Sequence, residues 1–252
     1  MEMKDVDKII DFIKDYFRVN SFAKGVVIGM SGGKDSLVTA KLCCEALGKD
    51  RVLGVIMPNG KMIDKNDAVI SCELLGIKYV NVDISNAYND IISNTENVLK
   101  SLNKEINSVT TINTAPRIRM TTLYAIGASL DYLVANTSNL SEAMVGYTTK
   151  WGDNVGDFAP LANFTKSEVC EIGLLLGLPT NLVNKTPSDG LSGSSDEAKM
   201  GIKYANLDSY IRTGVVNEDV ERINKMHKSS NHKRIGAIKY ENDLPNYLKW
   251  NI

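Results

Sequence analysis

Residues 25–36 read Gly-Val-Val-Ile-Gly-Met-Ser-Gly-Gly-Lys-Asp-Ser, and this stretch decides the fold. Its first half contains Val26 to Met30, a short continuous apolar run that is typical of a strand buried on both faces of a parallel sheet. A Ser-Gly-Gly turn follows, and it leads directly into a helical stretch from Leu37 to Leu47. A strand, a tight turn and a helix in immediate succession predict the first part of a βαβ unit.

The Ser31-Gly32-Gly33 turn favours anion binding. It offers closely spaced backbone N–H groups, two glycines that can adopt positive φ, and the partly positive N-terminus of the following helix. These features predict a site for a phosphate or pyrophosphate. It is not a Walker loop, because Ile28 stands where that loop has Gly and Asp35 stands where it has Ser or Thr. Gly29-Met30-Ser31 also breaks the Gly-x-Gly spacing of the dinucleotide fingerprint.

Strand-like and helix-like segments alternate on both sides of this loop. Helices are expected at 6–19, 37–47, 66–75, 86–107 and 116–130, and further strands at Val52–Met57, Lys78–Val82 and Tyr132–Ala135. This alternation predicts an α/β fold, a doubly wound and mostly parallel sheet with helices on both faces.

The remainder of the chain is expected to be helical. Thr165 and Glu168 have the spacing of a capping box, and helices are predicted near 203–213 and 218–229. Residues 185–197, rich in Ser with Pro and Gly, predict a mobile loop. Residues 1–252 are interpreted as a single domain.

Composition excludes several classes of function. The chain of 252 residues has 29 Lys and Arg against 30 Asp and Glu, so its net charge of -1 gives no global attraction to nucleic acid or anionic membranes. No segment approaches the roughly 18 apolar residues of a membrane span, and a cytoplasmic enzyme is expected. Neither the four cysteines nor the two histidines have the spacing of a zinc or redox site. Any chemistry therefore depends on phosphates, carboxylates and lysines.

Polar side chains follow the second and fourth predicted strands. They are Asn59, Asp64 and Asp67 after the second, and Thr137, Ser138 and Glu142 after the fourth. Ligands of such sheets bind at the carboxyl ends of the strands, so we expect these residues to converge with the Ser-Gly-Gly loop along one edge.

The sequence Ser-Gly-Gly-x-Asp-Ser after a buried first strand resembles the pyrophosphatase loop of the N-type ATP pyrophosphatase superfamily, which has the adenine nucleotide α-hydrolase-like fold. The resemblance implies that the loop binds ATP through Gly29, Ser31, Gly32, Gly33 and Ser36. It also implies that Asp35 ligates Mg²⁺, a pairing that suits a hard cation, and that the α–β bond of ATP is broken. The alternative is a plain βα turn in which Asp35 and Ser36 only cap the helix. Lys34 is at a variable position and is expected to face solvent.

From about residue 5 to 240 the chain resembles ammonia-dependent NAD synthetases. The motifs behind this resemblance are Arg117-Ile118-Arg119-Met120, Thr137 with Glu142, Lys150-Trp-Gly-Asp, Asp157, Lys166, Ser195-Asp196-Glu197 and His232-Lys233. The resemblance implies a ligase that adenylates the nicotinate carboxylate of deamido-NAD with ATP and aminates it with ammonia to give NAD, AMP and pyrophosphate. It also implies a homodimer, to which the helices near 86–107 and 116–130 contribute.

The resemblance assigns roles residue by residue. Asp35 and Glu142 become Mg²⁺ ligands, and Asp35, Ser36 and Lys166 become catalytic. Thr137, Lys166 and Ser188 would contact ATP, and Arg117, Lys150, Asp157, His232 and Lys233 would contact deamido-NAD.

Plainer interpretations of these residues stay open. Glu142 could be an acid favoured by a helix N-terminus, and Asp64 and Asp67 could be helix caps. Lys150 and Lys166 could be solvated charges, and Asp157 could close a turn. Arg117 could belong to the start of a helix whose first position is Pro116, and His232-Lys233-Arg234 could be a basic tail.

The chain departs from the family pattern near the nucleotide. Lys61-Met62-Ile63-Asp64-Lys65 follows Gly60 where the family has x-Gln-x-Asp-Glu, Asn136-Thr137-Ser138 replaces Gly-Thr-Asp, Ser188 replaces Thr, and Thr114-Ala115-Pro116 replaces a more basic segment. The ATP loop is unchanged, so adenylation is expected, whereas the identity of the acceptor stays open.

Two other functions remain as alternatives. One is another pyrophosphatase-loop enzyme that aminates or modifies a nucleotide, and the other is a catalytically silent nucleotide-binding protein. Glutamine-using relatives have an amidase domain ahead of the synthetase, whereas the loop here begins at residue 31, so ammonia is the expected nitrogen donor.

Overall fold

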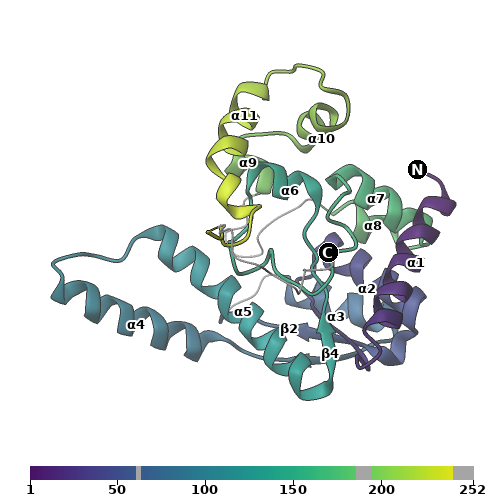
Figure 1. The fold of residues 1–252 in the computed structure, drawn as a ribbon, viewed down its shortest axis with the longest axis horizontal. Coiled ribbons are helices and arrows are strands. Elements are labelled where there is room, and N and C mark those ends of the chain that lie inside the picture. Colours follow the sequence, from purple (N-terminus) through teal and green to yellow (C-terminus); the bar gives the residue numbers. More distant parts are fainter. Residues whose placement is uncertain (61–63, 186–194, 241–252) are drawn as a thin grey trace.

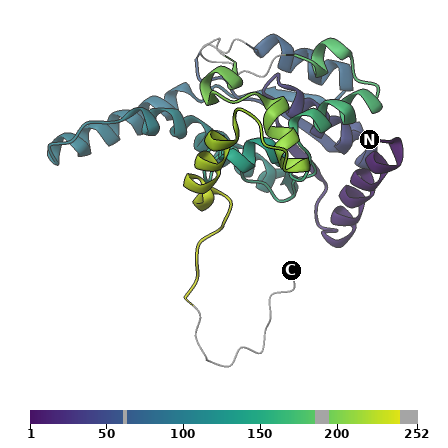
Figure 2. The same ribbon diagram turned by 90° about the horizontal axis from the view of Figure 1, so that it is seen from above.

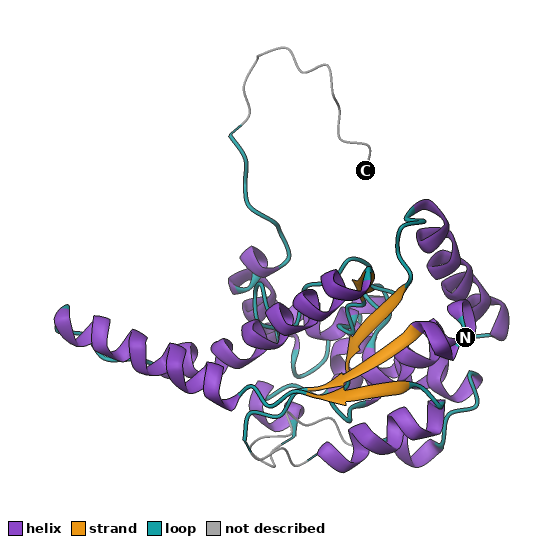
Figure 3. Ribbon diagram, turned by 90° about the horizontal axis from the view of Figure 1, so that it is seen from below, coloured by secondary structure: helices purple, strands orange, loops and turns teal. Residues whose placement is uncertain are grey.

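The structure, a computed structural model, describes residues 1–60, 64–185 and 195–240. Its centre is a four-stranded sheet in the order β3-β2-β1-β4, in which every neighbouring pair is parallel (Figure 3). The strands are β1 (Gly25–Gly29), β2 (Val52–Ile56), β3 (Lys78–Asn81) and β4 (Tyr132–Val134). Because all four strands are parallel, their carboxyl ends meet at one edge, as the sequence predicted.

Helices cover both faces of the sheet (Figure 1). One face packs against α1 (Met3–Val19), α2 (Lys34–Leu47), α3 (Lys65–Leu75) and α7 (Lys166–Leu175), and the other against α5 (Ser108–Leu130) with the start of α4 (Ser85–Ser101). The rest of α4 and the beginning of α5 run side by side and project from the body as an arm (Figures 1 and 2).

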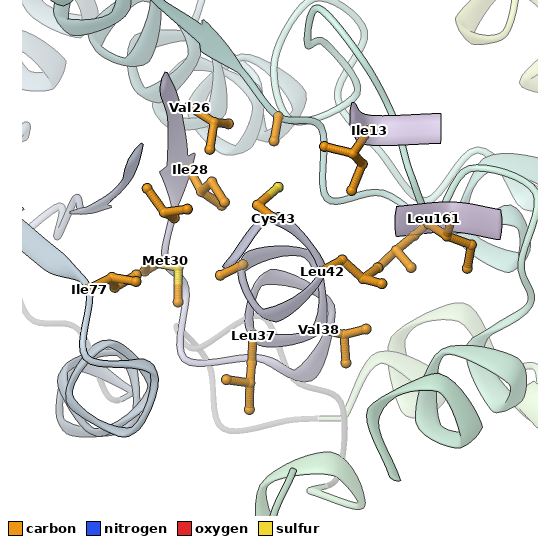
Figure 4. Packing of buried hydrophobic residues seen from close by; sticks show 14 of the residues in the cluster. Ile13, Val26, Ile28, Met30, Leu37, Val38, Leu42, Cys43, Ile77 and Leu161 are labelled. Carbon is orange, nitrogen blue, oxygen red and sulfur yellow. The ribbon is translucent and has the colours of Figure 1, made fainter. Parts of the chain in front are cut away.

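The alternation of side chains along β1 explains why its sequence is a continuous apolar run. Val26 and Ile28 lie on one face, in a cluster with residues of α1 and α2 such as Ile13 and Leu42 (Figure 4). Val27 lies on the opposite face, in a cluster with residues of α5 and β4. The predicted burial of this strand on both faces is confirmed. The packing on both faces holds β1 in place, and with it the position of the Ser-Gly-Gly loop that follows.

The remaining helices pack beside the carboxyl edge of the sheet. They are α6 (Leu140–Val145), α8 (Thr180–Val183), α9 (Asp196–Met200), α10 (Tyr204–Thr213) and α11 (Val220–Ser229), with 3₁₀ turns at Lys49–Arg51 and Asn231–Lys233. A small apolar cluster that includes Val145, Leu207 and Ile223 joins α6 to α10 and α11. Within the described residues, no helix is both long and apolar enough to cross a membrane.

Three expectations about the elements need correction. Pro116 is not at the first position of a helix: α5 begins eight residues earlier, with the side chain of Asn107 accepting a hydrogen bond from Thr110 N, and Pro116 lies inside it. Residues 102–107 connect α4 to α5 and are not helical. Of the loop expected at 185–197, residues 186–194 lie outside the described part, and Asp196 already begins α9.

Candidate active site

The Ser-Gly-Gly loop closes on itself at the end of β1. Gly32 has a φ of 81°, and a Cβ there would lie 2.5 Å from the carbonyl oxygen of Asp64, so this position requires glycine. Gly33 N donates to Ser31 Oγ at 3.2 Å, and Ser36 Oγ donates to the Gly33 carbonyl at 2.9 Å. Among residues 1–60, 64–185 and 195–240, no side chain caps α2, so its first-turn N–H groups are available for an anion.

Beside this loop, one lysine links two carboxylates from different elements. Lys166 Nζ, at the start of α7, donates to Asp35 Oδ2 on α2 at 2.7 Å and to Glu142 Oε1 on α6 at 2.8 Å. Lys166 is only 5% exposed. Burial opposes its charge, yet Asp35 and Glu142 hold the pKa of Lys166 well above its usual value. The ammonium is therefore charged at neutral pH, which excludes a solvated surface role for Lys166.

Glu142 is ionised less readily than an exposed glutamate. Burial raises the pKa of Glu142, Lys166 opposes that shift, and the Asp35 carboxylate adds to it. Two acids that share one ammonium can bind a second cation only if both are ionised, so a metal ion would favour their charged forms.

Asn139 connects the Asp35 carboxylate to the backbone of Glu142 and was not anticipated from the sequence. Its Nδ2 donates to Asp35 Oδ1 at 2.9 Å, and its Oδ1 accepts from Glu142 N at 3.0 Å as the cap of α6. Asn139 is fully buried. It therefore orients Asp35 and begins the helix on which Glu142 lies.

The donor set of the two carboxylates is compatible with a magnesium ion. Asp35 and Glu142 present hard oxygen donors on either side of one cation position, at the rim of the anion-binding loop. No group of three or more His, Cys, Asp or Glu suited to a metal occurs among the described residues. In proteins, Mg²⁺ is commonly coordinated by one or two carboxylates, with phosphates and water as the remaining ligands of an octahedron. The carboxylates of Asp35 and Glu142 agree with this preference.

A cavity of about 970 Å³ opens from this constellation. The predicted site residues that line it are Gly29, Ser31, Gly33, Asp35, Ser36, Thr137, Glu142, Lys166 and Lys233. The ends of β1 and β4 and the start of α7 thus meet at one place, as expected for ligands of a parallel sheet.

The other predicted acceptor residues do not line this cavity. Arg117 Nε donates to the Lys150 carbonyl at 3.2 Å, and the Lys150 ammonium lies over the ring of Trp151. The carboxylate of Asp157 accepts from Val134 N at 2.7 Å and fastens the end of β4. His232 is exposed. Ser188 lies outside the described residues.

Lys34 does not face solvent. It is 7% exposed, and its ammonium contacts Cys170 Sγ on α7 at 3.4 Å. The reason is that the first turn of α2 packs against α7, which the sequence around residue 34 does not reveal.

Two further cations near the cavity were not predicted as site residues. Lys185, after α8, is bonded to the carboxylates of Asp64 and Asp67, so Asp64 occupies the cap position of α3 while its side chain pairs with a lysine. Arg119 lines the cavity, and its Nε donates to the Met57 carbonyl at 3.0 Å. In the sequence, the only indication of a role for Arg119 was the Arg-x-Arg pair, which did not distinguish Arg119 from Arg117.

Asn136 and Ser138, the two residues after β4 that depart from the family pattern, are both bonded to the backbone carbonyl of Asp153. Asn136 Nδ2 and Ser138 Oγ both donate to the backbone oxygen of Asp153, at 3.3 and 3.1 Å. Burial raises the pKa of the Asp153 carboxylate, which also accepts from Thr149 N. The segments that begin at Asn136 and end at Asp153 therefore form one connected wall of the cavity.

Comparisons with known proteins point to one family. The family model described as NAD synthase matches residues 5–237. The NH3-dependent NAD+ synthetase of Thermococcus sibiricus is 39% identical over 247 residues, which cover 92% of this chain and 94% of the relative. The enzyme of the same name from Pyrococcus furiosus is also 39% identical, over 92% of this chain and 91% of its own length.

Solved structures of two proteins superpose on nearly the whole of this chain. An NMN synthetase from Francisella tularensis superposes with a TM-score of 0.86 at 34% identity, covering 96% of this chain and 100% of its own. An NH3-dependent NAD synthetase from Campylobacter jejuni superposes with a TM-score of 0.76 at 29% identity, with the same coverage.

Proposed function

The chain belongs to the NAD synthase family, and we propose that it uses ATP and ammonia to convert the nicotinate carboxylate of deamido-NAD into the amide of NAD. The observation that supports this most strongly is the Lys166 ammonium between Asp35 and Glu142, directly beside the Ser-Gly-Gly loop. A buried positive charge and two carboxylates that can ligate a metal lie next to a turn suited to binding phosphate. This combination of groups supports transfer of an adenylyl group.

The proposed reaction has two steps. An oxygen of the acceptor carboxylate attacks the α-phosphorus of ATP, pyrophosphate leaves, and an acyl adenylate forms. Ammonia then adds to the activated carbonyl carbon, AMP leaves, and a proton is released. The products are the amide, AMP and pyrophosphate.

This chain's own residues bind and neutralise the departing pyrophosphate. The N–H groups at the start of α2, with Ser31 and Ser36, are directed at the loop and provide hydrogen-bond donors. Lys166, buried and charged, offsets negative charge that develops on the phosphates. Asp35 and Glu142 would hold Mg²⁺, whose contribution would be Lewis-acid stabilisation of the negative charge on the phosphates.

We propose that the acceptor lies at the Lys233 end of the cavity. Lys233 lines the cavity, and its ammonium donates to the carbonyls of Gly146 and Thr148, both at 2.7 Å. Burial lowers the pKa of Lys233, and Asp153 opposes that shift. For Asp157 the bond to Val134 N supports a role in holding β4 rather than direct contact with the acceptor.

We further propose that the chain forms a homodimer through the face of α4 and α5. An apolar groove of about 1040 Å³ crosses this face, with walls that include Val80, Ile91, Ile126 and Leu130. Arg117 also lines the groove and contacts Lys150, so a second copy seated there would lie beside two of the residues that the family resemblance assigns to the acceptor.

A second candidate function is amination of nicotinate mononucleotide to NMN. Two observations favour it: the superposition on the NMN synthetase with a TM-score of 0.86, and the replacement of Gly-Thr-Asp by Asn136-Thr137-Ser138, whose outer side chains are bound to the Asp153 carbonyl. The two functions share the adenylation site and differ only in the acceptor.

One assay tests both functions. The purified chain is incubated with ATP, Mg²⁺, ammonium and either deamido-NAD or nicotinate mononucleotide, and amide, AMP and pyrophosphate are measured. We expect equal amounts of the three products, with a larger kcat/KM for deamido-NAD. A larger kcat/KM for the mononucleotide would establish the second candidate, and no amide with either acceptor would refute both.

Two variants control this assay. Asp35→Ala removes a proposed metal ligand and is expected to lower turnover at least about a hundredfold while the circular dichroism spectrum is unchanged. Asp15→Ala removes an exposed acid of α1 that pairs with Arg18, and its turnover should equal that of the wild type. An active Asp35→Ala protein would contradict the magnesium assignment.

A further inference from the structure

Asp208 is a buried carboxylate on α10 that lies outside the cavity and binds both helices of the candidate active site. Asp208 Oδ2 accepts from Ser167 N at 2.8 Å and from Ser167 Oγ at 2.6 Å, and its Oδ1 accepts from Ser141 Oγ at 2.5 Å. Asp208 is 6% exposed. It does not line the cavity, so it does not reach the substrates.

The partners of Asp208 are the sequence neighbours of two proposed site residues. Ser141 precedes Glu142, and Ser167 follows Lys166. Ser141 Oγ in turn accepts from Lys166 N at 2.9 Å, which closes a chain of hydrogen bonds between the first turns of α6 and α7. The two first turns are thus held together by the Asp208 carboxylate and by the direct bond from Lys166 N to Ser141 Oγ.

Asp208 accepts its three hydrogen bonds at these helix starts. No cation within ion-pair distance of Asp208 is found among the described residues. The N-termini of α6 and α7 carry partial positive charge, and three donors satisfy the carboxylate. Its loss would leave the buried Ser141 hydroxyl without its acceptor, whereas Ser167 is exposed and could bond to water instead.

The same helix supports the Lys166 side chain. Tyr204 lies one turn before Asp208 on α10, so the two share a face. The ring of Tyr204 lies 5.3 Å from Lys166 Nζ, within the range of a cation–π contact. Its hydroxyl is buried and has no hydrogen-bond partner in the part of the chain that the structure describes, so the contact of Tyr204 with Lys166 is made by the ring.

We propose that Asp208 is a positioning residue for adenylation: acting through Ser141 and Ser167, it sets the separation of Glu142 and Lys166. The inference rests on the proposed function and extends it to the C-terminal helices, which supply no predicted ATP ligand and yet fix the groups that would act on ATP.

Asp208→Asn tests the proposal because it keeps the shape of the side chain and removes its charge. The one oxygen of the new amide can still accept from Ser167, whereas the amide NH₂ group replaces the oxygen that accepts from Ser141 Oγ. The link through residue 208 is then weakened, and the bond from Lys166 N to Ser141 Oγ is the one that remains between the two first turns. A displacement of about 1 Å between reacting groups can cost on the order of a hundredfold in rate, so we expect kcat to fall at least about tenfold, with KM for ATP within about threefold.

Asp219→Asn is the matched control. Asp219 accepts from Lys203 N at 3.1 Å and from Asn206 Nδ2 at 2.8 Å, and so joins the start of α10 to the start of α11 without touching α6 or α7. The same substitution there weakens the C-terminal helices and should leave kcat and metal binding unchanged.

A second readout does not depend on the acceptor. Binding of Mn²⁺ in the presence of the nonhydrolysable analogue α,β-methylene-ATP is followed by electron paramagnetic resonance. Asp208→Asn should weaken this binding about tenfold, because Glu142 is displaced from Asp35. If the wild type makes no amide with any acceptor, the proposed function fails, and Mn²⁺ binding still decides the role of Asp208.

Ser167→Ala covers the case in which Asp208→Asn does not fold. It deletes one hydroxyl donor and keeps the bond from Ser167 N to Asp208. We expect kcat to fall and Mn²⁺ binding to weaken, each by about threefold. Wild-type kcat and Mn²⁺ binding in the folded variant would overturn the proposal. The proposal would also be overturned if Asp208→Asn and Asp219→Asn lost kcat and Mn²⁺ affinity equally, in proportion to their losses of thermal stability.

Discussion

Two buried lysines flank the ATP loop, and their surroundings differ. Lys166 lies between Asp35 and Glu142, whereas the Lys34 ammonium contacts Cys170 Sγ. The motif order predicted Lys166 as a site residue, and the structure brings its ammonium to Asp35 and Glu142, which were predicted with it. The burial of Lys34 could not be foreseen, because it depends on the packing of α2 against α7, across more than 130 residues of sequence.

The position of the Lys166 ammonium leads to a prediction about metal binding. Because it occupies the space between the two carboxylates, Lys166→Met should bind Mg²⁺ alone, without ATP, roughly tenfold more tightly than the wild type. Lys34→Met removes the same charge from the neighbouring loop and should change the affinity less than about threefold. Isothermal titration calorimetry measures both affinities. Equal gains in the two variants would show that net charge, and not occupancy of the site, controls binding.

Asn139 shows what a sequence motif leaves out. Its position three residues before Glu142 fits the cap of a helix, and the structure has that cap. Its second bond, to Asp35, joins residues 104 positions apart, and no local pattern reports such a contact. Short motifs in the sequence marked Asp35 and Glu142 as candidate ligands, whereas no short motif marked the residue that orients them.

Helix α5 shows where local patterns fail. Residues 108–115 are rich in Thr and Asn, and Pro116 follows, so the sequence favoured a helix that starts at the proline. The structure extends the helix back to Ser108, because Asn107 caps it and Tyr88 on α4 donates to the Thr111 carbonyl. Tertiary contacts outweigh propensity here.

The capping box of α7 was predicted correctly, and the structure adds a partner to it. Thr165 N donates to Glu168 Oε2 at 2.8 Å, and Arg212 on α10 donates to both oxygens of Glu168. Burial acts to raise the pKa of Glu168, but the bonds from Arg212 and Thr165 outweigh it and the pKa is lowered from 4.5. Glu168 therefore links α7 to α10 as an anion.

Stability should depend on pH through Glu168. A group with a lowered pKa in the folded state stabilises the fold above its unfolded pKa, and this contribution is lost as pH falls through the folded value. Urea unfolding of Glu168→Gln should show a deficit of roughly 0.5–1 kcal/mol at pH 7, which disappears well below pH 4.5. Glu73→Gln, at an exposed acid of α3, should show none. A deficit that persists unchanged to pH 3 would contradict this account.

At the scale of the whole molecule, the alternation of strands and helices was enough to predict a parallel sheet with both faces covered. It also predicted that polar residues after β2 and β4 would meet the ATP loop, which the cavity confirms for Thr137, Ser138, Asn59 and Asp64. The arm of α4 and α5 was not foreseeable, because its shape depends on how two helices leave the sheet (Figure 2).

The apolar groove between the start of α4, the later part of α5 and strands β2 and β3 predicts an effect of charge on assembly. Ala125 on α5 lines the groove, and Ala128 on the same helix is exposed outside it. Ala125→Glu should shift the chain toward the monomer in analytical ultracentrifugation, because a buried unpaired carboxylate is costly. Ala128→Glu should sediment as the wild type. A wild-type monomer at all concentrations, or a dimeric Ala125→Glu, would contradict the assignment of this face.

The central claim is that the Ser-Gly-Gly loop, Asp35, Glu142 and Lys166 promote attack of the acceptor carboxylate on the α-phosphorus of ATP. The most direct test uses an acceptor whose two carboxylate oxygens are ¹⁸O, with mass spectrometry of all products. The account predicts one ¹⁸O in each AMP, the other in the amide, and none in pyrophosphate. Label in pyrophosphate or inorganic phosphate, or AMP without label, would contradict it.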